Sequence, residues 1–271
     1  MLVSAYWLKK NFLKKNIKIL DASWYLPNVN RNALNEFKKT RIPGAKFFDI
    51  DEICDQLSAF PHMLPNKKFF EKKVSNLGIK FNDVLIIYCR EGILSSPRVW
   101  WIFKYFGHKK VFILNGGFKA WGLANGKIIG GPVERKITKY KTGRIMYNYS
   151  ITFNNLINML REFIPCYVID GRPERRFLGL DPEPRKNIGS GKIEGSFNLD
   201  FTLFDRNGYL KKRSEIRNIY SSVVKKKNKI ILSCGSGVSA CTLAFALDYI
   251  GNNRWSVYDG SWTEWYSRTK N

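Results

Sequence analysis

One cysteine of this chain lies where the local sequence predicts a reactive thiol. Residues 230–241 read Ile-Ile-Leu-Ser-Cys-Gly-Ser-Gly-Val-Ser-Ala-Cys, so a short apolar run ends at Cys234, and two glycines and two serines follow within five residues. The run predicts a buried strand, and the apolar stretch from Ala240 to Ile250 predicts a helix that is ended by Gly251. A tight loop between a strand and a helix turns backbone N–H groups inward and favours an anion at its centre. We expect this anion to be the thiolate of Cys234.

The loop after Cys234 predicts a nucleophile in preference to a structural cysteine. Free cysteines are among the most buried residue types, so a packed thiol is the ordinary alternative. Two glycines directly in the loop argue against it, because they allow the backbone to approach a ligand closely. No histidine lies nearby in the sequence, so the loop N–H groups and the helix end must stabilise the thiolate. The residues expected to form this cradle are Gly235, Ser236, Gly237, Val238 and Ser239.

The segments that must position Cys234 occur twice in the chain. Each half has a strand ending in aspartate, a second strand ending in cysteine, a helix ending at glycine, and a third strand that leads through glycine to tryptophan. Corresponding landmarks are offset by 144 to 151 residues, a regularity that indicates a duplicated domain. The paired segments are 17–21 with 167–170, 84–89 with 229–234, 99–106 with 240–250, and 111–121 with 255–265.

Alternating strands and helices in each half predict an α/β fold, with a mostly parallel sheet flanked by helices. Such sheets place their sites at the carboxyl ends of strands, where Cys234 and Cys89 both lie. A Gly-Gly-Pro turn followed by a basic run marks the joint between the halves. We predict an N-terminal domain over 1–125, a linker over 126–149, and a C-terminal domain over 150–271 that carries the nucleophile.

Composition limits the class of protein. The chain has 271 residues and is 44% apolar, which is enough for two globular domains. Five cysteines without a Cys-x-x-Cys spacing, together with two histidines, predict free thiols and neither a disulfide framework nor a zinc site. No apolar stretch approaches the roughly eighteen residues of a membrane span, and the start of the chain lacks the features of a signal peptide. We therefore expect a cytosolic protein.

The formal net charge of +24 has two interpretations. Basic surfaces bind phosphate backbones in a salt-dependent way. The lysines, however, are scattered through every segment, often beside Asn and Ile, and no nucleic-acid recognition motif accompanies them. A compositional bias with a solvated surface explains this pattern better than a dedicated nucleic-acid site. An attraction for small anionic substrates is compatible with it.

The duplicated plan, with Cys-Gly-Ser-Gly-Val-Ser at residues 234–239, resembles the tandem-domain rhodanese superfamily and, within it, the 3-mercaptopyruvate sulfurtransferases. The resemblance spans nearly the whole chain and implies two tandem rhodanese-like domains. Its landmarks follow one another in the order of the family: Ile42-Pro43-Gly44-Ala45, Pro61-His62-Met63-Leu64-Pro65, Ser96-Pro97-Arg98-Val99-Trp100-Trp101, Asp181-Pro182-Glu183-Pro184-Arg185 and Tyr258-Asp259-Gly260-Ser261-Trp262.

The resemblance implies the catalytic residues. In the family, the loop cysteine attacks the sulfur of 3-mercaptopyruvate, pyruvate leaves, and the persulfide passes its outer sulfur to a thiol or cyanide. Cys234 stands at this position. The family's Ser-His-Asp arrangement corresponds to Ser236, His62 and Asp51, the last two from the first domain. From the residues alone, His62 would be a packed loop histidine, and Asp51 would hydrogen-bond its own backbone in a turn.

The resemblance also implies how the substrate is held. A carboxylate next to a ketone calls for a guanidinium, and the family's pair of arginines corresponds to Arg176 and Arg185. We expect Arg172 and Arg175, which lie nearby in the sequence, to have no part in substrate binding. An arbitrary arginine is usually a solvated surface residue, so this assignment depends on the resemblance.

Cys89 departs from the family, whose first domain usually has an acid at this position. The segment Cys89-Arg90-Glu91-Gly92-Ile93-Leu94-Ser95 resembles the active loop of single-domain rhodaneses. A second sulfur site is one interpretation, and a loop without function is the other. We favour the second, because Ile93 and Leu94 supply neither glycine nor a polar lining.

The function predicted from this resemblance is that of a cytosolic sulfurtransferase that needs no cofactor, no nucleic acid and no membrane. Its partners are 3-mercaptopyruvate and a thiol, cyanide or thioredoxin-like acceptor. Neutral Gly235 and Ser236 favour mercaptopyruvate, because thiosulfate-using relatives typically carry basic residues after the cysteine. Thiosulfate:cyanide sulfurtransfer is the alternative within the enzyme class. A non-catalytic persulfide carrier or basic binding module is the alternative outside it.

Overall fold

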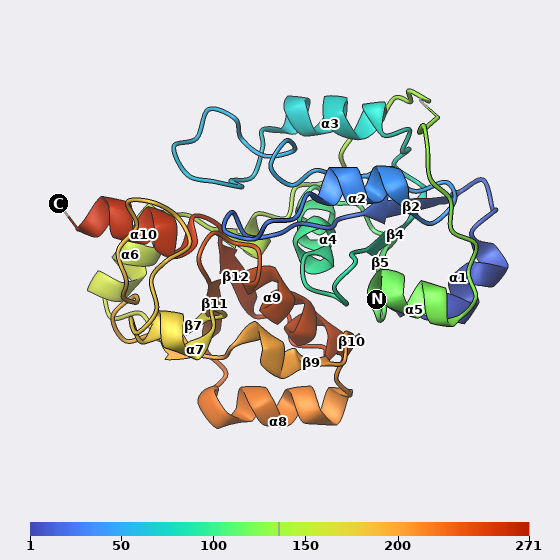
Figure 1. The fold of residues 1–271 in the computed structure, drawn as a ribbon. Helices are drawn as coiled ribbons and strands as arrows, with labels where there is room; N and C mark the ends of the chain where they lie inside the picture. Colours follow the sequence, from blue (N-terminus) through green and yellow to red (C-terminus); the bar gives the residue numbers. More distant parts are fainter. Residues whose placement is uncertain (135, 271) are drawn as a thin grey trace. The chain divides into compact units, whose positions relative to one another are not determined.

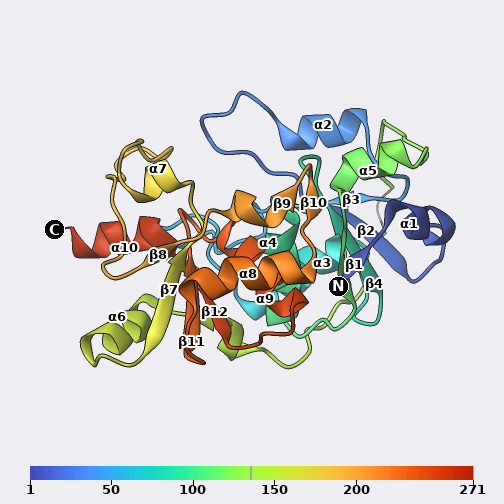
Figure 2. The same cartoon turned by 90° about the horizontal axis from the view of Figure 1, so that it is seen from below.

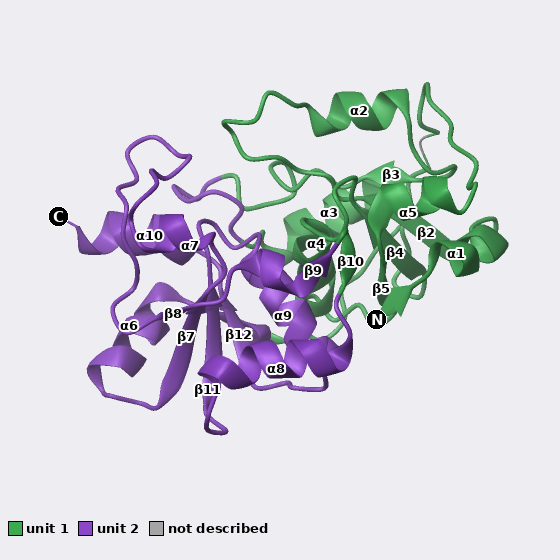
Figure 3. Cartoon of the chain, turned by 60° about the horizontal axis from the view of Figure 1, so that its bottom comes forward, with its two compact units in different colours: residues 1–56, 64–146, 207–210 green, residues 57–63, 147–206, 211–271 purple. Residues whose placement is uncertain are grey.

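The computed structural model describes residues 1–134 and 136–270. The chain divides into two compact units, which Figure 3 colours separately. Unit 1 comprises residues 1–56, 64–146 and 207–210, and unit 2 comprises residues 57–63, 147–206 and 211–271. The predicted linker over 126–149 contains Arg135, which lies outside the described residues, as does Asn271 of the predicted C-terminal domain. Most of that linker segment belongs to unit 1, where Ile129 forms an isolated antiparallel bridge with Arg41.

Unit 1 contains a five-stranded parallel sheet in the order β1-β5-β4-β2-β3 among its described residues (Figure 1). The strands are β1 (Leu2–Val3), β2 (Ile17–Asp21), β3 (Lys46–Phe47), β4 (Val84–Tyr88) and β5 (Val111–Leu114). The helices are α1 (Ala5–Asn11), α2 (Ala33–Lys39), α3 (Lys67–Asn76), α4 (Ser96–Tyr105) and α5 (Gly117–Leu123). Register pairs Asp21 with Tyr88, so the two central strands end side by side.

Alternation of side chains along the strands of unit 1 supplies two buried faces. On one face, Ile86 and Tyr88 pack with Leu8 of α1 and Trp121 of α5. Helices α1 and α5 contact each other, and Figure 1 shows them side by side. Helix α4 packs on β4 and β5, and its residues Ser96 to Phe103 are all buried. The near-continuous apolar strands of the sequence are therefore central strands covered by helices.

Unit 2 repeats this plan with a parallel sheet of five strands in the order β6-β12-β11-β7-β8 among its described residues. The strands are β6 (Ser150–Ile151), β7 (Cys166–Asp170), β8 (Phe197–Asn198), β11 (Lys229–Ser233) and β12 (Trp255–Tyr258). The helices are α6 (Phe153–Arg161), α7 (Glu174–Phe177), α8 (Arg213–Val223), α9 (Ala240–Tyr249) and α10 (Ser261–Thr269), with 3₁₀ turns η1 (Tyr147–Tyr149) and η2 (Phe201–Phe204). Two short strands, β9 (Asp205–Arg206) and β10 (Tyr209–Leu210), precede α8 in the sequence.

Helix α9 is the central helix of unit 2. Every residue from Ala240 to Leu247 is buried, because the helix contacts β11, β12, η2 and α8. Helix α8 contacts α9, and Figure 2 shows the two helices side by side. Leu156 of α6 and Trp262 of α10 pack with Val168 and Ile231 of the sheet in a separate cluster. The apolar composition of α9 is thus explained by burial around its whole circumference.

The two equivalent strand orders confirm the predicted α/β fold of two duplicated domains. The strands predicted at residues 17–21, 84–89, 167–170 and 229–234 coincide with β2, β4, β7 and β11 to within one residue at either end. Cys234 directly follows β11 and Cys89 directly follows β4, each the central strand of its sheet. Within the described residues, every helix is too short or too polar to span a lipid bilayer.

Candidate active site

The loop that carries Cys234 is hydrogen-bonded to the first turn of α10. The backbone N–H of Trp262 donates to the carbonyl of Cys234 at 2.9 Å, and that of Thr263 donates to the carbonyl of Gly235 at 3.0 Å. The Thr263 hydroxyl donates to the same carbonyl at 2.7 Å. Because both carbonyls are bonded to α10, the loop backbone is fixed in one orientation at the carboxyl edge of the sheet.

The N–H groups of the same loop are left available. Among the described residues, no hydrogen-bond acceptor lies within reach of the backbone N–H groups of Gly235, Ser236, Val238 and Ser239. All but Ser239 are buried, and Cys234 itself is only 2% exposed. Buried N–H groups without an acceptor are rare because each costs free energy. A loop with several of them next to a thiol is suited to an anion, as the sequence predicted.

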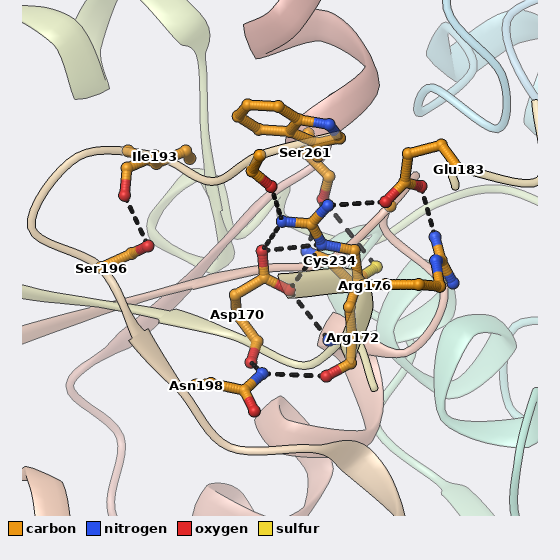
Figure 4. Close-up of polar contacts among 12 residues, drawn as sticks. Asp170, Arg172, Arg176, Glu183, Ile193, Ser196, Asn198, Cys234 and Ser261 are labelled. Atoms are coloured by element: carbon orange, nitrogen blue, oxygen red, sulfur yellow. Dashed lines mark hydrogen bonds and ion pairs between the residues drawn. The ribbon is translucent and has the colours of Figure 1, made fainter. Parts of the chain in front are cut away.

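Ser261 is a neighbour of Cys234 that sequence reasoning missed. Its hydroxyl oxygen accepts the backbone N–H of Cys234 at 3.1 Å and lies 4.0 Å from the Cys234 sulfur, and its proton goes to the Tyr258 carbonyl at 2.8 Å (Figure 4). Ser261 has a φ of 51°, a left-handed conformation that is unusual for serine. The position of Ser261 just after β12, which pairs with β11, was the available signal.

Ser236 and His62 meet in unit 2 although they are 174 positions apart in the sequence. Nδ1 of His62 lies 3.2 Å from the Ser236 hydroxyl and 3.3 Å from the Ser236 carbonyl. Both residues are 4% exposed, and His62 has a φ of 63°. The nitrogen can accept the hydroxyl proton or donate to the carbonyl, depending on its tautomer. The pair can therefore hold and move one proton two residues from Cys234.

Asp51 belongs to unit 1. Its carboxylate accepts the indole N–H of Trp24 at 3.1 Å, and its backbone N–H donates to the carboxylate of Asp49 at 3.0 Å. Burial raises the pKa of Asp49, and the charge of Asp51 adds to this shift. The turn is thus held by Asp49, and the pairing of Asp51 with His62 stays a prediction.

Arg176 of α7 lies directly against the loop. A Cβ atom built on Gly235 would stand 3.0 Å from Nη2 of Arg176, so only glycine leaves full room for this guanidinium. The Arg176 side chain is 15% exposed, and its Nε is buried without a hydrogen-bond partner among the described residues. A guanidinium with a spare donor next to the thiol loop is suited to binding a carboxylate or ketone oxygen.

Glu183 holds Arg176 in place and is itself held by Arg172. Its two carboxylate oxygens accept hydrogen bonds, one from Nη2 of Arg176 at 2.5 Å and one from Nη1 of Arg172 at 2.7 Å (Figure 4). Arg172 is also bonded to Asp170, at 2.7 Å, and to the Gly191 carbonyl, at 2.8 Å. Burial opposes the charge of Arg172, but Asp170 and Glu183 outweigh it, and its pKa is raised.

The four arginines of this segment differ in their burial and in their salt-bridge partners. Arg172 is 1% exposed and fully engaged in the network, whereas Arg175 is 67% exposed and pairs with Asp181. Arg176 lies against the loop at Gly235. Arg185 is half-buried after Pro184, and its predicted contact with substrate stays a prediction. Glu183, an acid between two prolines in an arginine-rich segment, was missed as the residue that orients Arg176.

The loop of Cys89 in unit 1 is closed by its own backbone. The Cys89 thiol donates to the Gly92 carbonyl at 3.4 Å, and its side chain is buried. Burial raises the pKa of this thiol, although Ser95 and Ser96 oppose the shift. A protonated thiol bonded to carbonyls is not prepared for nucleophilic attack, in agreement with the interpretation of this loop as functionless. Among the described residues, no three His, Cys, Asp or Glu side chains are grouped so as to hold a metal ion.

Comparisons with known proteins agree with this arrangement. The rhodanese-like domain family matches residues 4–124 and 153–268. The 3-mercaptopyruvate sulfurtransferase of Mus musculus is 39% identical over 279 residues, which cover 99% of this chain and 93% of the relative. The thiosulfate sulfurtransferase of Mus musculus is 35% identical over 279 residues, covering 98% and 92%. The crystal structure of SseA from Escherichia coli, described as a 3-mercaptopyruvate sulfotransferase, has a TM-score of 0.86 at 32% identity, covering 96% of this chain and 98% of that one.

Proposed function

Since the chain belongs to the rhodanese-like family, with two such domains in tandem, we propose that it is a 3-mercaptopyruvate sulfurtransferase. It takes sulfur from 3-mercaptopyruvate on Cys234, releases pyruvate, and passes the sulfur to an acceptor. The observation that carries this proposal is the guanidinium of Arg176 held against Gly235, the residue after Cys234. A fixed cation for a carboxylate lies beside a thiol in a loop of available N–H donors, and the proposed donor carries both a carboxylate and a sulfur.

The first half-reaction begins with the Cys234 thiolate. The thiolate attacks the sulfur of 3-mercaptopyruvate, an S–S bond forms, and the C–S bond breaks with its electron pair moving to carbon. The resulting enolate of pyruvate takes up the proton that the substrate thiol gives up. The products are pyruvate and a Cys234 persulfide. The available N–H groups of Gly235, Ser236, Val238 and Ser239 stabilise the anion before and after the transfer.

The Ser236–His62 pair is proposed to move that proton. The substrate thiol must lose a proton while the enolate carbon gains one, so a group that can both accept and donate suits the step. The 3.2 Å contact between Nδ1 of His62 and the Ser236 hydroxyl supports such a relay. Asp51 is proposed to orient His62. Arg176 and Arg185 are proposed to bind the carboxylate and the ketone, with Glu183 fixing the direction of Arg176.

The second half-reaction transfers the outer sulfur to an acceptor. A thiolate or cyanide attacks the outer sulfur, the S–S bond breaks, and Cys234 is released as a thiolate. We propose a small thiol, cyanide or a thioredoxin-like protein as acceptor, and the cytosol as the location. A relative from Arabidopsis thaliana is named mitochondrial, so fractionation with antibodies to the chain is the direct test of location.

The decisive experiment is intact-mass spectrometry after addition of 3-mercaptopyruvate, with pyruvate assayed in parallel. We expect one adduct of about 32 Da, one sulfur, mapped to Cys234, together with pyruvate release. Cys234→Ser should lose both, and the matched Cys89→Ser variant should keep both. Pyruvate turnover by Cys234→Ser would overturn the mechanism. A sulfur adduct formed without catalytic turnover would favour a persulfide carrier.

Thiosulfate:cyanide sulfurtransfer is the second candidate, because a thiosulfate sulfurtransferase is 35% identical over 98% of the chain. Thiosulfate is a dianion, and the residues after Cys234 are the neutral Gly235 and Ser236. We therefore expect a higher kcat/KM for 3-mercaptopyruvate than for thiosulfate with cyanide as common acceptor. The reverse order would identify the chain as a thiosulfate sulfurtransferase.

A further inference from the structure

Unit 1 contains a pocket of about 440 Å³ that the proposed sulfur transfer does not use. It is formed where the chain enters β2, by the turn before β3, by the residues after α3, and by Ile129, Pro132 to Glu134 and Lys136. Its volume falls within the range of roughly 300–1,000 Å³ that is usual for small-molecule sites. Every residue in its lining belongs to unit 1, whereas Cys234 belongs to unit 2.

The polar lining of this pocket is strongly cationic. Glu134 is the single acidic residue among the described residues of the lining. None of the cations forms a salt bridge within the described part of the chain. Six positive charges against one negative charge leave a positive potential, and a concave wall concentrates it. The six cations are Lys14, Lys15, Lys18, Arg41, Lys46 and Lys136.

Two of these cations are fixed by the fold. Arg41 is 3% exposed, and its guanidinium donates to the carbonyls of Gly131 and Pro132 at 2.8 and 2.7 Å. Carbonyl oxygens satisfy its N–H groups but do not neutralise its charge. Lys46 donates to the backbone carbonyl of Glu134. These bonds keep two positive groups at the pocket in the absence of any anion, so binding needs little reorganisation.

The electrostatic state of Lys46 is independent support for a positive pocket. Burial lowers the pKa of Lys46, Glu134 partly opposes this shift, and the nearby charges of Arg41 and Lys18 lower the pKa further. A bound anion would relieve both the repulsion and the desolvation of the ammonium group. Binding would therefore favour protonated Lys46, and the affinity for an anion should fall as Lys46 loses its proton.

The remaining lining is apolar. Leu13 is exposed and Phe12 and Ile129 are half-buried, so these side chains present apolar surface, whereas Ile17 and Ile19 at the start of β2 are buried in the core. A bare inorganic anion would leave this surface in water, whereas a ligand with a flat or apolar body would cover it. We propose that the pocket binds an organic anion of nucleotide size, with its phosphate on the lysines and its apolar body on Phe12, Leu13 and Ile129. This inference does not depend on the sulfurtransferase activity.

Isothermal titration of the full chain with adenosine monophosphate, adenosine and inorganic phosphate tests the proposal. We expect adenosine monophosphate to bind more tightly than either part alone, since the pocket has surface for both. Lys18→Ala and Lys46→Ala should each weaken binding about tenfold, the loss of one charge-assisted hydrogen bond. Lys72→Ala, which removes an exposed lysine of α3 outside the pocket, is the matched control and should bind as the unchanged chain does.

Three results would overturn the proposal. Equal affinity for inorganic phosphate and adenosine monophosphate would indicate a simple ion site. Equal weakening by Lys72→Ala and Lys46→Ala would indicate a general basic surface. No binding of any probe above that of a salt-matched blank would show that the pocket is not a site for this class of ligand. Circular dichroism melting of each variant separates loss of binding from loss of folding. Lys18 is half-exposed, and among the described residues its ammonium group donates a hydrogen bond to the Lys15 carbonyl alone. Lys18→Ala is therefore a variant with little effect on folding.

Discussion

Replacing Glu183 by glutamine should release Arg176 while leaving Arg172 in place. The glutamate accepts one hydrogen bond at each oxygen, from Arg172 at 2.7 Å and from Arg176 at 2.5 Å. Glutamine has one oxygen and one NH₂ group, so it can accept from only one guanidinium and presents a donor to the other. Arg172 is also held by Asp170 and Gly191, whereas Glu183 is the partner found for Arg176. The amide oxygen should therefore stay with Arg172, and Arg176 should be displaced from Gly235.

The expected changes in stability and in KM follow from the loss of the hydrogen bond between Arg176 and Glu183. One charge-assisted hydrogen bond disappears at a carboxylate that is 3% exposed, so we expect the free energy of unfolding to fall by about 2 kcal/mol. If Arg176 binds the substrate carboxylate in both ground and transition states, its displacement should raise KM for 3-mercaptopyruvate about tenfold to hundredfold with little change in kcat. Urea denaturation measures the first effect, and steady-state pyruvate release measures the second.

Asp181→Asn is the matched control, since Asp181 forms the same kind of pair with Arg175 in the same segment but is 40% exposed. Its loss should change stability by less than about 0.5 kcal/mol and leave KM unchanged. A second test uses Arg176→Ala: if Glu183 acts through Arg176, then Glu183→Gln should add no further rise in KM in that background. Additive effects on KM, or an unchanged KM in the single variant, would refute this reasoning.

Three further predictions concern the loop, its proton relay and a buried histidine. Gly235→Ala places a Cβ atom 3.0 Å from Nη2 of Arg176. Because this nitrogen is the far end of a flexible side chain, the protein should fold, but KM for 3-mercaptopyruvate should rise about tenfold. An unchanged KM would show that the guanidinium is not needed there. Ser236→Ala and His62→Ala should each lower kcat about a hundredfold. The double variant should be no slower than either single variant, because the two side chains act as a pair. The measurement is the rate of pyruvate release by the three variants. His108 donates to the Asp83 carbonyl at 2.9 Å, and burial lowers its pKa, so the unfolded chain binds more protons than the folded one just below pH 6.5. The titration of His108 should therefore not affect stability above that pH, and stability should fall by up to about 1.4 kcal/mol per pH unit below it, until the lowered pKa is reached. The difference in urea midpoint between the chain and His108→Gln should be constant above about pH 6.5 and change only below it.

Local patterns in the sequence were sufficient for the architecture of each half. The apolar runs at β2, β4, β7 and β11 alternate with helices along the sequence, and this alternation predicted a mostly parallel sheet covered by helices. The runs are largely buried in the structure. The repeat offset then paired the halves, and the two strand orders are equivalent. The position of Cys234 at the carboxyl end of a central strand followed from the same pattern, because strand and loop are adjacent in sequence.

The residues around Cys234 could not be predicted in the same way, because they lie in irregular segments without a periodic sequence pattern. Ser261 reaches the Cys234 backbone through the pairing of β11 with β12, and Glu183 selects Arg176 over Arg175 through a buried network that begins at Asp170. Sequence resemblance suggested His62, but only the folded chain brings its ring 3.2 Å from Ser236, across 174 positions. Neighbouring residues were enough to predict the strands, the duplication and the loop after Cys234, because each of these depends on a local pattern. Burial and pairing depend on segments that are distant along the chain, so the folded chain was needed to show which charges are neutralised and which remain available.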